Sequence, residues 1–258
     1  KVNISDLDIA YSPERIDPLN KKWDIFNTPK LVSGLTEKSK ERVTKFYRKF
    51  VGSVIPCESL EVAESAKLLE NTFRFINISF INEFSIFCNK LGVDVNAVIK
   101  AASSKPYGFM SFYPGAGVGG HCIPVDPIYL KTSADLLEAP ARFIDLADKV
   151  NREIPHYLVK RAEDKLVTLE GKNILVIGVA YKPNIADVRE SPAEGLISLL
   201  RSKGAKVSWH DQHVKEWNTE YSTPLAKNYD LAILITAHDY LDLTLLGDLP
   251  IIDARKSN

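Results

Sequence analysis

The fold of this chain is decided by the stretch NILVIGV at residues 173–179, an apolar run that begins directly after Lys172. A short uninterrupted apolar run is typical of a strand that is buried on both faces of a parallel sheet. A helix is expected to follow at residues 192–203, with further strands at 206–209, 230–235 and 250–253. Strands separated by helical segments require parallel crossovers, so the sequence predicts a doubly wound α/β domain from about residue 168 onward.

The start of the chain also has an α/β pattern. Residues 2–11 have the character of an extended segment, and strands are expected at residues 29–34 and 51–55. Thr36 is expected to cap a helix between these two strands, because Glu37 follows it and apolar residues then recur at helical spacing.

The middle of the chain has a helical pattern. Residues 59–91 contain neither Pro nor Gly and carry a wide apolar stripe, which predicts one long helix that ends at Gly92. Helices are also expected at residues 94–103 and 141–166, and Pro155 should kink or break the second of these. Because the long helix is apolar on so broad a face, we expect it to pair with its copy in a second subunit and form a homodimer.

Composition excludes several classes of partner. The 33 Lys and Arg residues balance the 33 Asp and Glu residues, so no charge excess suits nucleic acid or an acidic membrane. No apolar run is long enough to span a bilayer, and the first residues do not resemble a signal or transit peptide. The three cysteines have no paired spacing, which favours a reducing compartment, taken here as the cytoplasm, over disulfides or a metal site.

A glycine-rich loop is the most informative stretch for function. Gly115, Gly117 and Gly120 match the pattern G-x-G-x-x-G, but two helices rather than a strand precede them, which disfavours a dinucleotide-binding turn. Only glycine lets the main chain approach a ligand so closely and take positive φ, so we expect the loop to contact a bound substrate. A plain connector is the alternative.

Cys122 ends this loop and lies two residues before Pro124, which could open a helix at its first position. A thiol at a helix N-terminus is favoured as the thiolate, so Cys122 is a candidate nucleophile. A lone cysteine is more often a buried small apolar residue, as we expect for Cys57 and Cys88, but the glycines around Cys122 indicate access. His121 is expected to be structural, because adjacent side chains rarely point the same way.

Three further polar residues are candidates that spacing alone leaves open. Asp126 lies four residues after Cys122 and would share its pocket if the helix begins near Pro124. Lys67 and Asn71 are also four apart, so they leave one face of the long helix as neighbours. An ordinary solvated helix face is the alternative for this pair.

These signals combine into a resemblance to the UDP-glucose/GDP-mannose dehydrogenase family. The motifs that carry it occur in the family's order at residues 11–15, 63–83, 117–127, 178–184 and 187–192, and they cover nearly the whole chain. The stretches SPER at 12–15 and KPYGFM at 105–110 resemble the branch that acts on UDP-N-acetylhexosamines, especially UDP-N-acetylglucosamine 6-dehydrogenases.

The resemblance implies a three-part organisation within the α/β class. Residues 1–57 would be the C-terminal remnant of an NAD-binding Rossmann domain, residues 58–167 a central helical domain with the catalytic loop, and residues 168–258 a Rossmann-like UDP-binding domain. Family members begin with an NAD-binding domain that carries its own G-x-G-x-x-G, so we expect this chain to be truncated and to bind the sugar nucleotide better than NAD.

The resemblance also implies a reaction. These enzymes oxidise a C6 hydroxyl twice with two NAD, through a cysteine thiohemiacetal and thioester, to a uronic acid. The implied catalytic residues are Cys122, Lys67, Asn71, Asp126 and Glu14. The implied substrate contacts are Arg15, Tyr113, Gly117, Gly119, Gly120, Arg142, Tyr181, Lys182 and Arg255, while Arg189 would face the cofactor pyrophosphate.

Two other hypotheses stay open. The chain as given could be a non-catalytic UDP-sugar-binding and dimerisation module, and the substrate could be UDP-N-acetylmannosamine or UDP-glucose. A 6-phosphogluconate or hydroxyacid dehydrogenase that shares only the helical layer is disfavoured, since such an enzyme has no need for a nucleophilic cysteine in a glycine loop.

Overall fold

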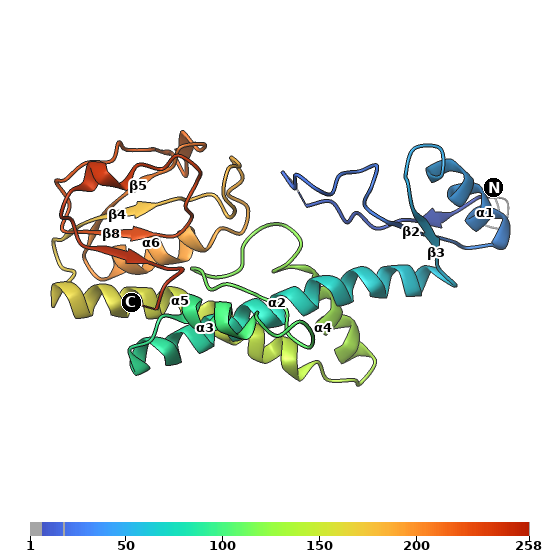
Figure 1. The fold of residues 1–258 in the computed structure, drawn as a ribbon, viewed down its shortest axis with the longest axis horizontal. Helices are drawn as coiled ribbons and strands as arrows, with labels where there is room; N and C mark the ends of the chain where they lie inside the picture. Colours follow the sequence, from blue (N-terminus) through green and yellow to red (C-terminus); the bar gives the residue numbers. More distant parts are fainter. Residues whose placement is uncertain (1–6, 18, 258) are drawn as a thin grey trace. The chain divides into compact units, whose positions relative to one another are not determined.

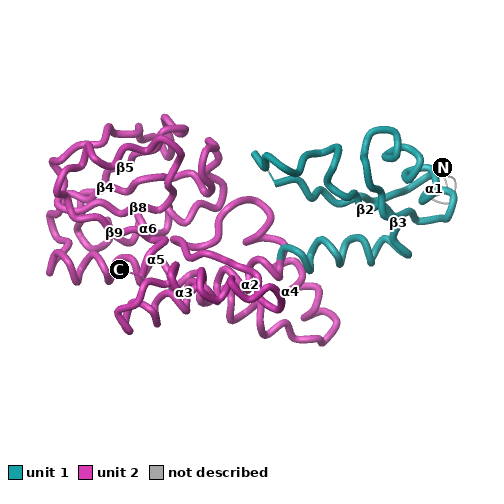
Figure 2. The backbone as a smooth tube through the Cα atoms, viewed as in Figure 1, with its two compact units in different colours: residues 1–71 teal, residues 72–258 magenta. Residues whose placement is uncertain are grey.

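The computed structural model describes residues 7–17 and 19–257 of the chain (Figure 1). The chain divides into two compact units, residues 1–71 and 72–258, and the boundary falls inside one long helix (Figure 2). The boundaries expected after residues 57 and 167 are not those of the compact units, and the three-part division stays a prediction.

The first unit is built on a three-stranded sheet. Strand β1 (Ala10–Tyr11) pairs antiparallel with β2 (Lys30–Gly34), which pairs in parallel with β3 (Val54–Pro56). Helix α1 (Glu37–Tyr47) connects β2 to β3 and packs on both strands. The expected α/β character of this region is confirmed, although residues 2–6 of the expected extended segment lie outside the described residues.

The local signals around α1 act as expected, with one shift. The Thr36 side chain accepts a hydrogen bond from the Ser39 N–H at 3.1 Å and so caps the helix. The strand expected at 51–55 begins only at Val54, because the Val51 N–H donates instead to the Tyr47 carbonyl at the end of the helix.

The long helix is confirmed as α2 (Leu60–Leu91), and Gly92 ends it with a φ of 74°. Helix α3 (Val95–Ala102) follows after the Asp94 cap, and the chain then forms the irregular glycine loop. Helices α4 (Asp126–Leu136) and α5 (Arg142–Leu166) complete the helical layer (Figure 1).

Two helix expectations need correction. Helix α4 begins at Asp126, two residues after Pro124, because a turn first forms in which the Cys122 carbonyl accepts from the Asp126 N–H at 2.8 Å. Helix α5 continues through Pro155 without a break. A proline inside a helix costs about 3 kcal/mol, and the burial of Ile154 and Leu158 on either side of it against the C-terminal core offsets this cost.

The C-terminal part of the second unit is the predicted doubly wound sheet. Its four parallel strands are ordered β5 (Lys206–His210), β4 (Asn173–Ile177), β8 (Leu231–Leu234) and β9 (Ile251–Asp253). Helix α6 (Pro192–Ser202) crosses from β4 to β5, and the 3-10 helix η2 (Leu243–Leu246) precedes β9. The sequence did not predict the short hairpin of β6 (Glu216–Trp217) and β7 (Glu220–Tyr221).

Burial on both faces of the sheet explains the uninterrupted apolar run of β4. Ile174 and Val176 pack toward α5 and α6, whereas Leu175 and Ile177 pack on the opposite face with Leu246. Strand residues alternate between faces, so a strand covered on both sides needs an apolar residue at every position. The chain passes from β4 to β5 on one side of β4, and then returns to β8 and β9 on the other side. Ligands of open α/β sheets bind at the carboxyl ends of the strands where the connections change side in this way.

Candidate active site

The thiol of Cys122 is exposed at the start of α4. The Cys122 carbonyl accepts hydrogen bonds from the N–H groups of both Val125 and Asp126, so the cysteine begins the first helical turn. The predicted exposure of Cys122 is confirmed, but the residue lies in the turn that precedes α4, four residues before the helix begins at Asp126.

Two asparagines hold the glycine loop that leads to Cys122. The Gly115 N–H donates to Asn82 Oδ1 on α2 at 2.8 Å, and the Val118 N–H donates to Asn151 Oδ1 on α5 at 2.7 Å. A third main-chain bond runs from the Gly120 N–H to the Arg189 carbonyl at 3.0 Å. The loop is therefore fixed at three points, and these three N–H groups are engaged within the protein.

The need for glycine at positions 119 and 120 arises from contact with Tyr181. A Cβ atom on Gly119 would lie 2.8 Å from the Tyr181 Cβ, and one on Gly120 would lie 2.9 Å from the Tyr181 ring. Gly120 also has a φ of 94°, which side chains rarely allow. The described chain between α3 and α4 forms no strand, so the reading of these glycines as a dinucleotide-binding turn is excluded, as expected.

The segment behind the loop adds charge next to the cysteine. Arg189 pairs with Asp187 at 2.6 Å, and the hydrogen bond from Arg189 holds the pKa of the Asp187 carboxyl below its usual range. Asp187 in turn raises the pKa of Arg189, and the charge of Cys122 adds to this effect. The structure thus brings Cys122, Gly119, Gly120, Tyr181 and Arg189 together.

Two predicted substrate contacts lie after the carboxyl ends of β4 and β9, two strands of the same parallel sheet that are separated by β8. Lys182 follows β4 in a half-buried position, and Arg255 follows β9. Arg255 forms two hydrogen bonds to the Asp253 carboxylate at 2.8 and 2.9 Å. Burial would raise the pKa of Asp253, but the hydrogen bonds from Arg255 outweigh burial and lower it.

Glu14 and Arg15 are both engaged within the first unit. Glu14 accepts from the Arg15 and Ile16 N–H groups and pairs with Lys30 at 3.1 Å. Burial acts to raise the pKa of Glu14, but the hydrogen bonds from Ile16, Lys30 and Arg15 lower it below the usual value. A carboxyl group with a lowered pKa is a poor proton donor at neutral pH, so Glu14 is less suited than expected to an acid role.

Arg15 has a structural role that the sequence did not indicate. Its guanidinium forms a two-pronged contact with Glu70 on α2, at 2.6 and 3.2 Å, and donates to the Pro29 carbonyl at 2.7 Å. These bonds attach the segment after β1 to α2, directly beside Asn71. Arg15 therefore positions this segment, and its predicted substrate contact stays a prediction.

Lys67 and Asn71 differ in exposure although they share a helix face. Asn71 is buried, at 5% exposure, and Lys67 is half-buried. Among the described residues, no hydrogen bond or ion pair involves the Lys67 ammonium. A buried asparagine on α2 is not what an ordinary solvated face would show, so the alternative interpretation of this pair is disfavoured.

The remaining predicted residues are less constrained. Tyr113 is exposed on the glycine loop, Arg142 is exposed at the first position of α5, and Asp126 is half-buried at the first position of α4. Cys88 is buried, as expected, and burial raises its pKa. Cys57 is only half-buried, so its assignment as a core residue is wrong.

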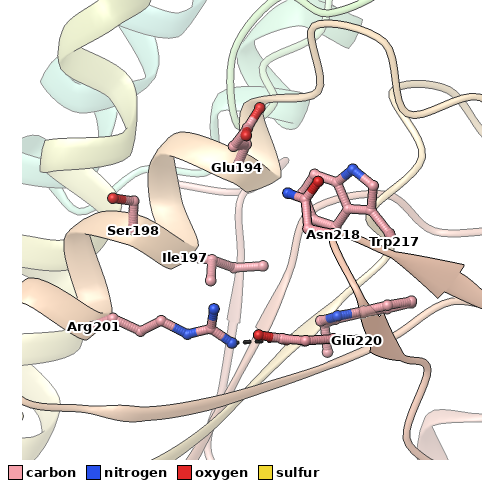
Figure 3. A pocket seen from close by; sticks show the side chains of 8 residues that line it. Glu194, Ile197, Ser198, Arg201, Trp217, Asn218 and Glu220 are labelled. Carbon is pink, nitrogen blue, oxygen red and sulfur yellow. Dashed lines mark hydrogen bonds and ion pairs between the residues drawn. The ribbon is translucent and has the colours of Figure 1, made fainter.

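Two hollows border the C-terminal domain. A groove of about 600 Å³ is lined by Gly117, Val118 and Asn151 together with the start of α6. A second pocket, of about 250 Å³, lies between α6 and the β6–β7 hairpin, where Arg201 pairs with Glu220 at 2.8 Å (Figure 3). Only the first hollow contains a predicted site residue.

Metal and membrane sites find no support in the described part of the chain. Residues 7–17 and 19–257 contain no group of three His, Cys, Asp or Glu side chains arranged to hold a metal ion. None of the helices in these residues combines the length and the apolar character needed to cross a bilayer.

Sequence reasoning missed the residues that hold the site. Asn151, Asp211 and His238 were not singled out, and Asn82 entered only as part of a motif. Asp211 and His238 follow the carboxyl ends of β5 and β8, so the rule that ligands gather at these ends would have indicated them. Nothing in the local sequence distinguishes Asn151 from other polar residues of α5.

Comparison with known proteins agrees with this geometry. Residues 61–153 match the central domain of the UDP-glucose/GDP-mannose dehydrogenase family, and residues 175–256 match its UDP-binding domain. The chain is 33% identical over 254 residues to a UDP-N-acetyl-D-mannosamine dehydrogenase of Methanococcus maripaludis, covering 97% of this chain and 58% of the relative. It is 34% identical over 245 residues to a UDP-N-acetyl-D-glucosamine 6-dehydrogenase of Salmonella typhi, covering 90% of this chain and 57% of the relative.

Solved structures extend the likeness to the fold. The UDP-D-ManNAc dehydrogenase of Pyrococcus horikoshii superimposes with a TM-score of 0.83 at 29% identity, covering 95% of this chain and 60% of the other. The chain thus spans somewhat more than half the length of the relatives it matches. Two matched domains, the shared fold and the exposed cysteine together lead to one conclusion: the chain belongs to the UDP-glucose/GDP-mannose dehydrogenase family of nucleotide-sugar dehydrogenases.

Proposed function

We propose that this chain is the catalytic-loop and UDP-sugar-binding part of an NAD-dependent UDP-N-acetylhexosamine 6-dehydrogenase, with UDP-N-acetylglucosamine as its substrate. The observation that carries the proposal is the exposed Cys122 thiol at the start of α4, on a loop fixed at three points. A nucleophile needs both access and a fixed direction of approach, and this loop supplies both.

The first oxidation converts the C6 hydroxyl to an aldehyde. The hydroxyl proton must be removed and the developing alkoxide stabilised as hydride leaves. By resemblance to the family, we assign this role to Lys67 and Asn71, with a water molecule held by Asp126. A bound NAD would supply the hydride acceptor for each of the two oxidations.

The second oxidation and the hydrolysis proceed on Cys122. The thiolate adds to the aldehyde carbon and forms a thiohemiacetal, which loses a second hydride and becomes a thioester. Water then attacks the thioester carbonyl, the C–S bond breaks, and the thiol and the uronic acid are released. Asp126 and Glu14 are the two candidates for the proton transfers of this step, and the hydrogen bonds that lower the pKa of Glu14 disfavour it as the proton donor.

The described residues fit the cofactor only in part. The exposed Arg189 guanidinium, beside Cys122, suits contact with a pyrophosphate. The strand, glycine turn and helix that bind a dinucleotide are not formed by the glycine loop of the described chain. From membership of the family we propose NAD as the cofactor, and we propose Arg189 as one of its contacts.

The substrate assignment separates two groups of relatives. One relative above is named for UDP-N-acetylglucosamine and two are named for UDP-N-acetylmannosamine. The test is to measure NADH absorbance and uronate formation with a panel that contains both sugars and UDP-glucose. The highest kcat/KM is expected for UDP-N-acetylglucosamine, and a higher value for either other sugar would overturn this choice.

A second candidate function rests on the domain match at residues 175–256, which is to the family's UDP-binding domain. The alternative that we propose is a UDP-sugar-binding and dimerisation module without activity of its own. Separate titration of the 258-residue chain with UDP-sugar and with NAD distinguishes the two. Binding of the UDP-sugar without reduction of NAD supports the module, and reduction of NAD excludes it.

We also propose a cytoplasmic homodimer that forms through α2. The side chains of Phe73, Phe80, Phe87 and Leu91 are 44%, 60%, 56% and 60% exposed, and their spacing of seven, seven and four places them on one helix face. An exposed apolar stripe of this kind marks an interaction surface. Light scattering at micromolar concentration should give the mass of a dimer, and Phe80→Glu should give a monomer; a wild-type monomer would contradict the proposal.

A further inference from the structure

The loop that follows β4 carries Tyr181 and Lys182, and it is held firmly at its start. The N–H groups of Val179 and Ala180 both donate to Asp211 Oδ2, at 2.8 and 3.0 Å. The Ala180 carbonyl accepts from the Thr236 hydroxyl at 2.7 Å. The main chain just before Tyr181 is thus attached to residues that follow β5 and β8.

The same loop is held at its end by His238. The Asn184 N–H donates to His238 Nδ1 at 2.8 Å, and the Asn184 side-chain oxygen accepts from the Asp239 N–H at 2.8 Å. Asn184 has a φ of 66°, so the chain turns sharply here. The His238 ring therefore fixes the chain two residues after Lys182.

A buried Asp–His pair joins the two attachment points. His238 Nε2 lies 3.0 Å from Asp211 Oδ2, and the two side chains are 1% and 0% exposed. Because Nδ1 accepts from a main-chain N–H, the proton of the neutral ring is on Nε2, which donates to the carboxylate. Asp211 also accepts from the N–H groups of His213 and Val214 at 2.8 and 3.0 Å.

The geometry points to Asp211 and His238 as positioning residues, which hold the Tyr181–Lys182 loop in the conformation that binds the UDP part of the substrate. Neither residue contacts the substrate in this arrangement; each acts through the main chain of residues 179–184. The inference rests on the proposed function, because it assumes that Lys182 contacts the nucleotide. If the loop is released, only a fraction of molecules is competent to bind, and the apparent affinity falls by that fraction.

The test measures UDP affinity and loop protection in the 258-residue chain. His238→Ala should weaken UDP binding in calorimetry by about tenfold, as expected when about a tenth of the molecules keep the competent loop. His238→Asn keeps an acceptor near the Asn184 N–H and should recover part of the affinity. Amide hydrogen exchange at Val179, Ala180 and Asn184 should accelerate in His238→Ala.

A matched control separates positioning from general destabilisation. Leu246 is buried in the core that covers the face of the sheet away from α5 and α6. Leu246→Ala should therefore lower the melting temperature without weakening UDP binding. If Leu246→Ala weakens binding as much as His238→Ala does, the effect is structural and the inference is wrong.

The failures of the two proposals are distinguishable. If the wild-type chain does not bind UDP, the proposed function fails, whereas exchange in residues 179–184 still reports whether His238 holds the loop. If the wild-type chain binds UDP and His238→Ala binds it equally well, the positioning role is overturned. An NMR signature of a proton on Nδ1 of His238 would also contradict it.

Discussion

The two loops that carry the candidate residues are held in different ways. The glycine loop is fixed by the neutral side chains of Asn82 and Asn151 and leaves its thiol exposed. The loop after β4 is fixed by the buried carboxylate of Asp211, which accepts four main-chain N–H groups and one imidazole N–H. The hydrogen bonds to the neutral asparagine side chains do not depend on pH, and each one can be removed separately. The hydrogen bonds to the buried carboxylate are stronger, but they all depend on one group that acid can protonate.

The largest expected effect comes from removal of the Cys122 thiol, which the glycine loop exposes. Cys122→Ser should lower uronate formation by at least about 10³-fold, because a serine hydroxyl is not ionised at neutral pH and does not replace the thiolate. The matched control is Cys57→Ser, at a half-buried cysteine of the first unit, which should leave the rate unchanged. Uronate formation at the wild-type rate by Cys122→Ser would remove this sulfur from the mechanism.

The second prediction concerns the Asp211 carboxylate and its contribution to the free energy of unfolding. Asp211→Asn keeps the shape but places an amide NH₂ among N–H donors, and should cost about 3 kcal/mol of unfolding free energy in urea. Burial alone would raise the pKa of Asp211, but hydrogen bonds from His238 and the main chain lower it from 3.8 to about 2.

This shift sets the sign of the pH dependence. Because the folded-state pKa is depressed, the stabilisation is present above about pH 4 and is lost as the pH falls toward 2. The difference in unfolding free energy between wild type and Asp211→Asn should therefore shrink by about 2 kcal/mol over this range. A difference that is constant with pH would show that Asp211 is not the group that titrates.

The third prediction concerns the contact of Gly120 with the Tyr181 ring, which an added methyl group would disturb. Gly120→Ala places a Cβ 2.9 Å from the Tyr181 ring at a φ of 94°, and should cost about 2 kcal/mol of stability. Gly171→Ala is the control, since its φ is 72° but nothing lies within 4 Å of the added Cβ, and it should cost about 1 kcal/mol. Equal costs in thermal unfolding would show that the ring contact contributes nothing.

The smallest expected effect comes from the loss of the hydrogen bond between Asn151 and the Val118 N–H. Asn151→Ala removes the acceptor for the Val118 N–H and should lower kcat by about tenfold, because the loop that directs Cys122 is less well placed. Asn151→Asp keeps an acceptor oxygen and should retain most of the activity. Steady-state kinetics decides, and a kcat for Asn151→Ala equal to wild type would show that Asn82 and the Gly120 bond hold the loop without it.

The sequence by itself determined most of the helices and strands and the position of Cys122 on an exposed loop. The apolar run at 173–179, the Thr36 cap, the long helix before Gly92 and the placement of Cys122 before a helix all depend on residues close together in the chain. Local periodicity, capping and helix-stop signals act over a few residues, so they are visible in the sequence. The family motifs added the family, from which the proposed chemistry follows.

Only the tertiary structure decided what holds the site. Asn82 and Gly115 are 33 residues apart, as are Asn151 and Val118, and Asp211 is 32 residues from Val179. No local pattern encodes such pairings, because they depend on how the helices and the sheet pack. For the same reason the sequence did not show that Gly119 and Gly120 accommodate Tyr181, or that packing lets α5 continue through Pro155.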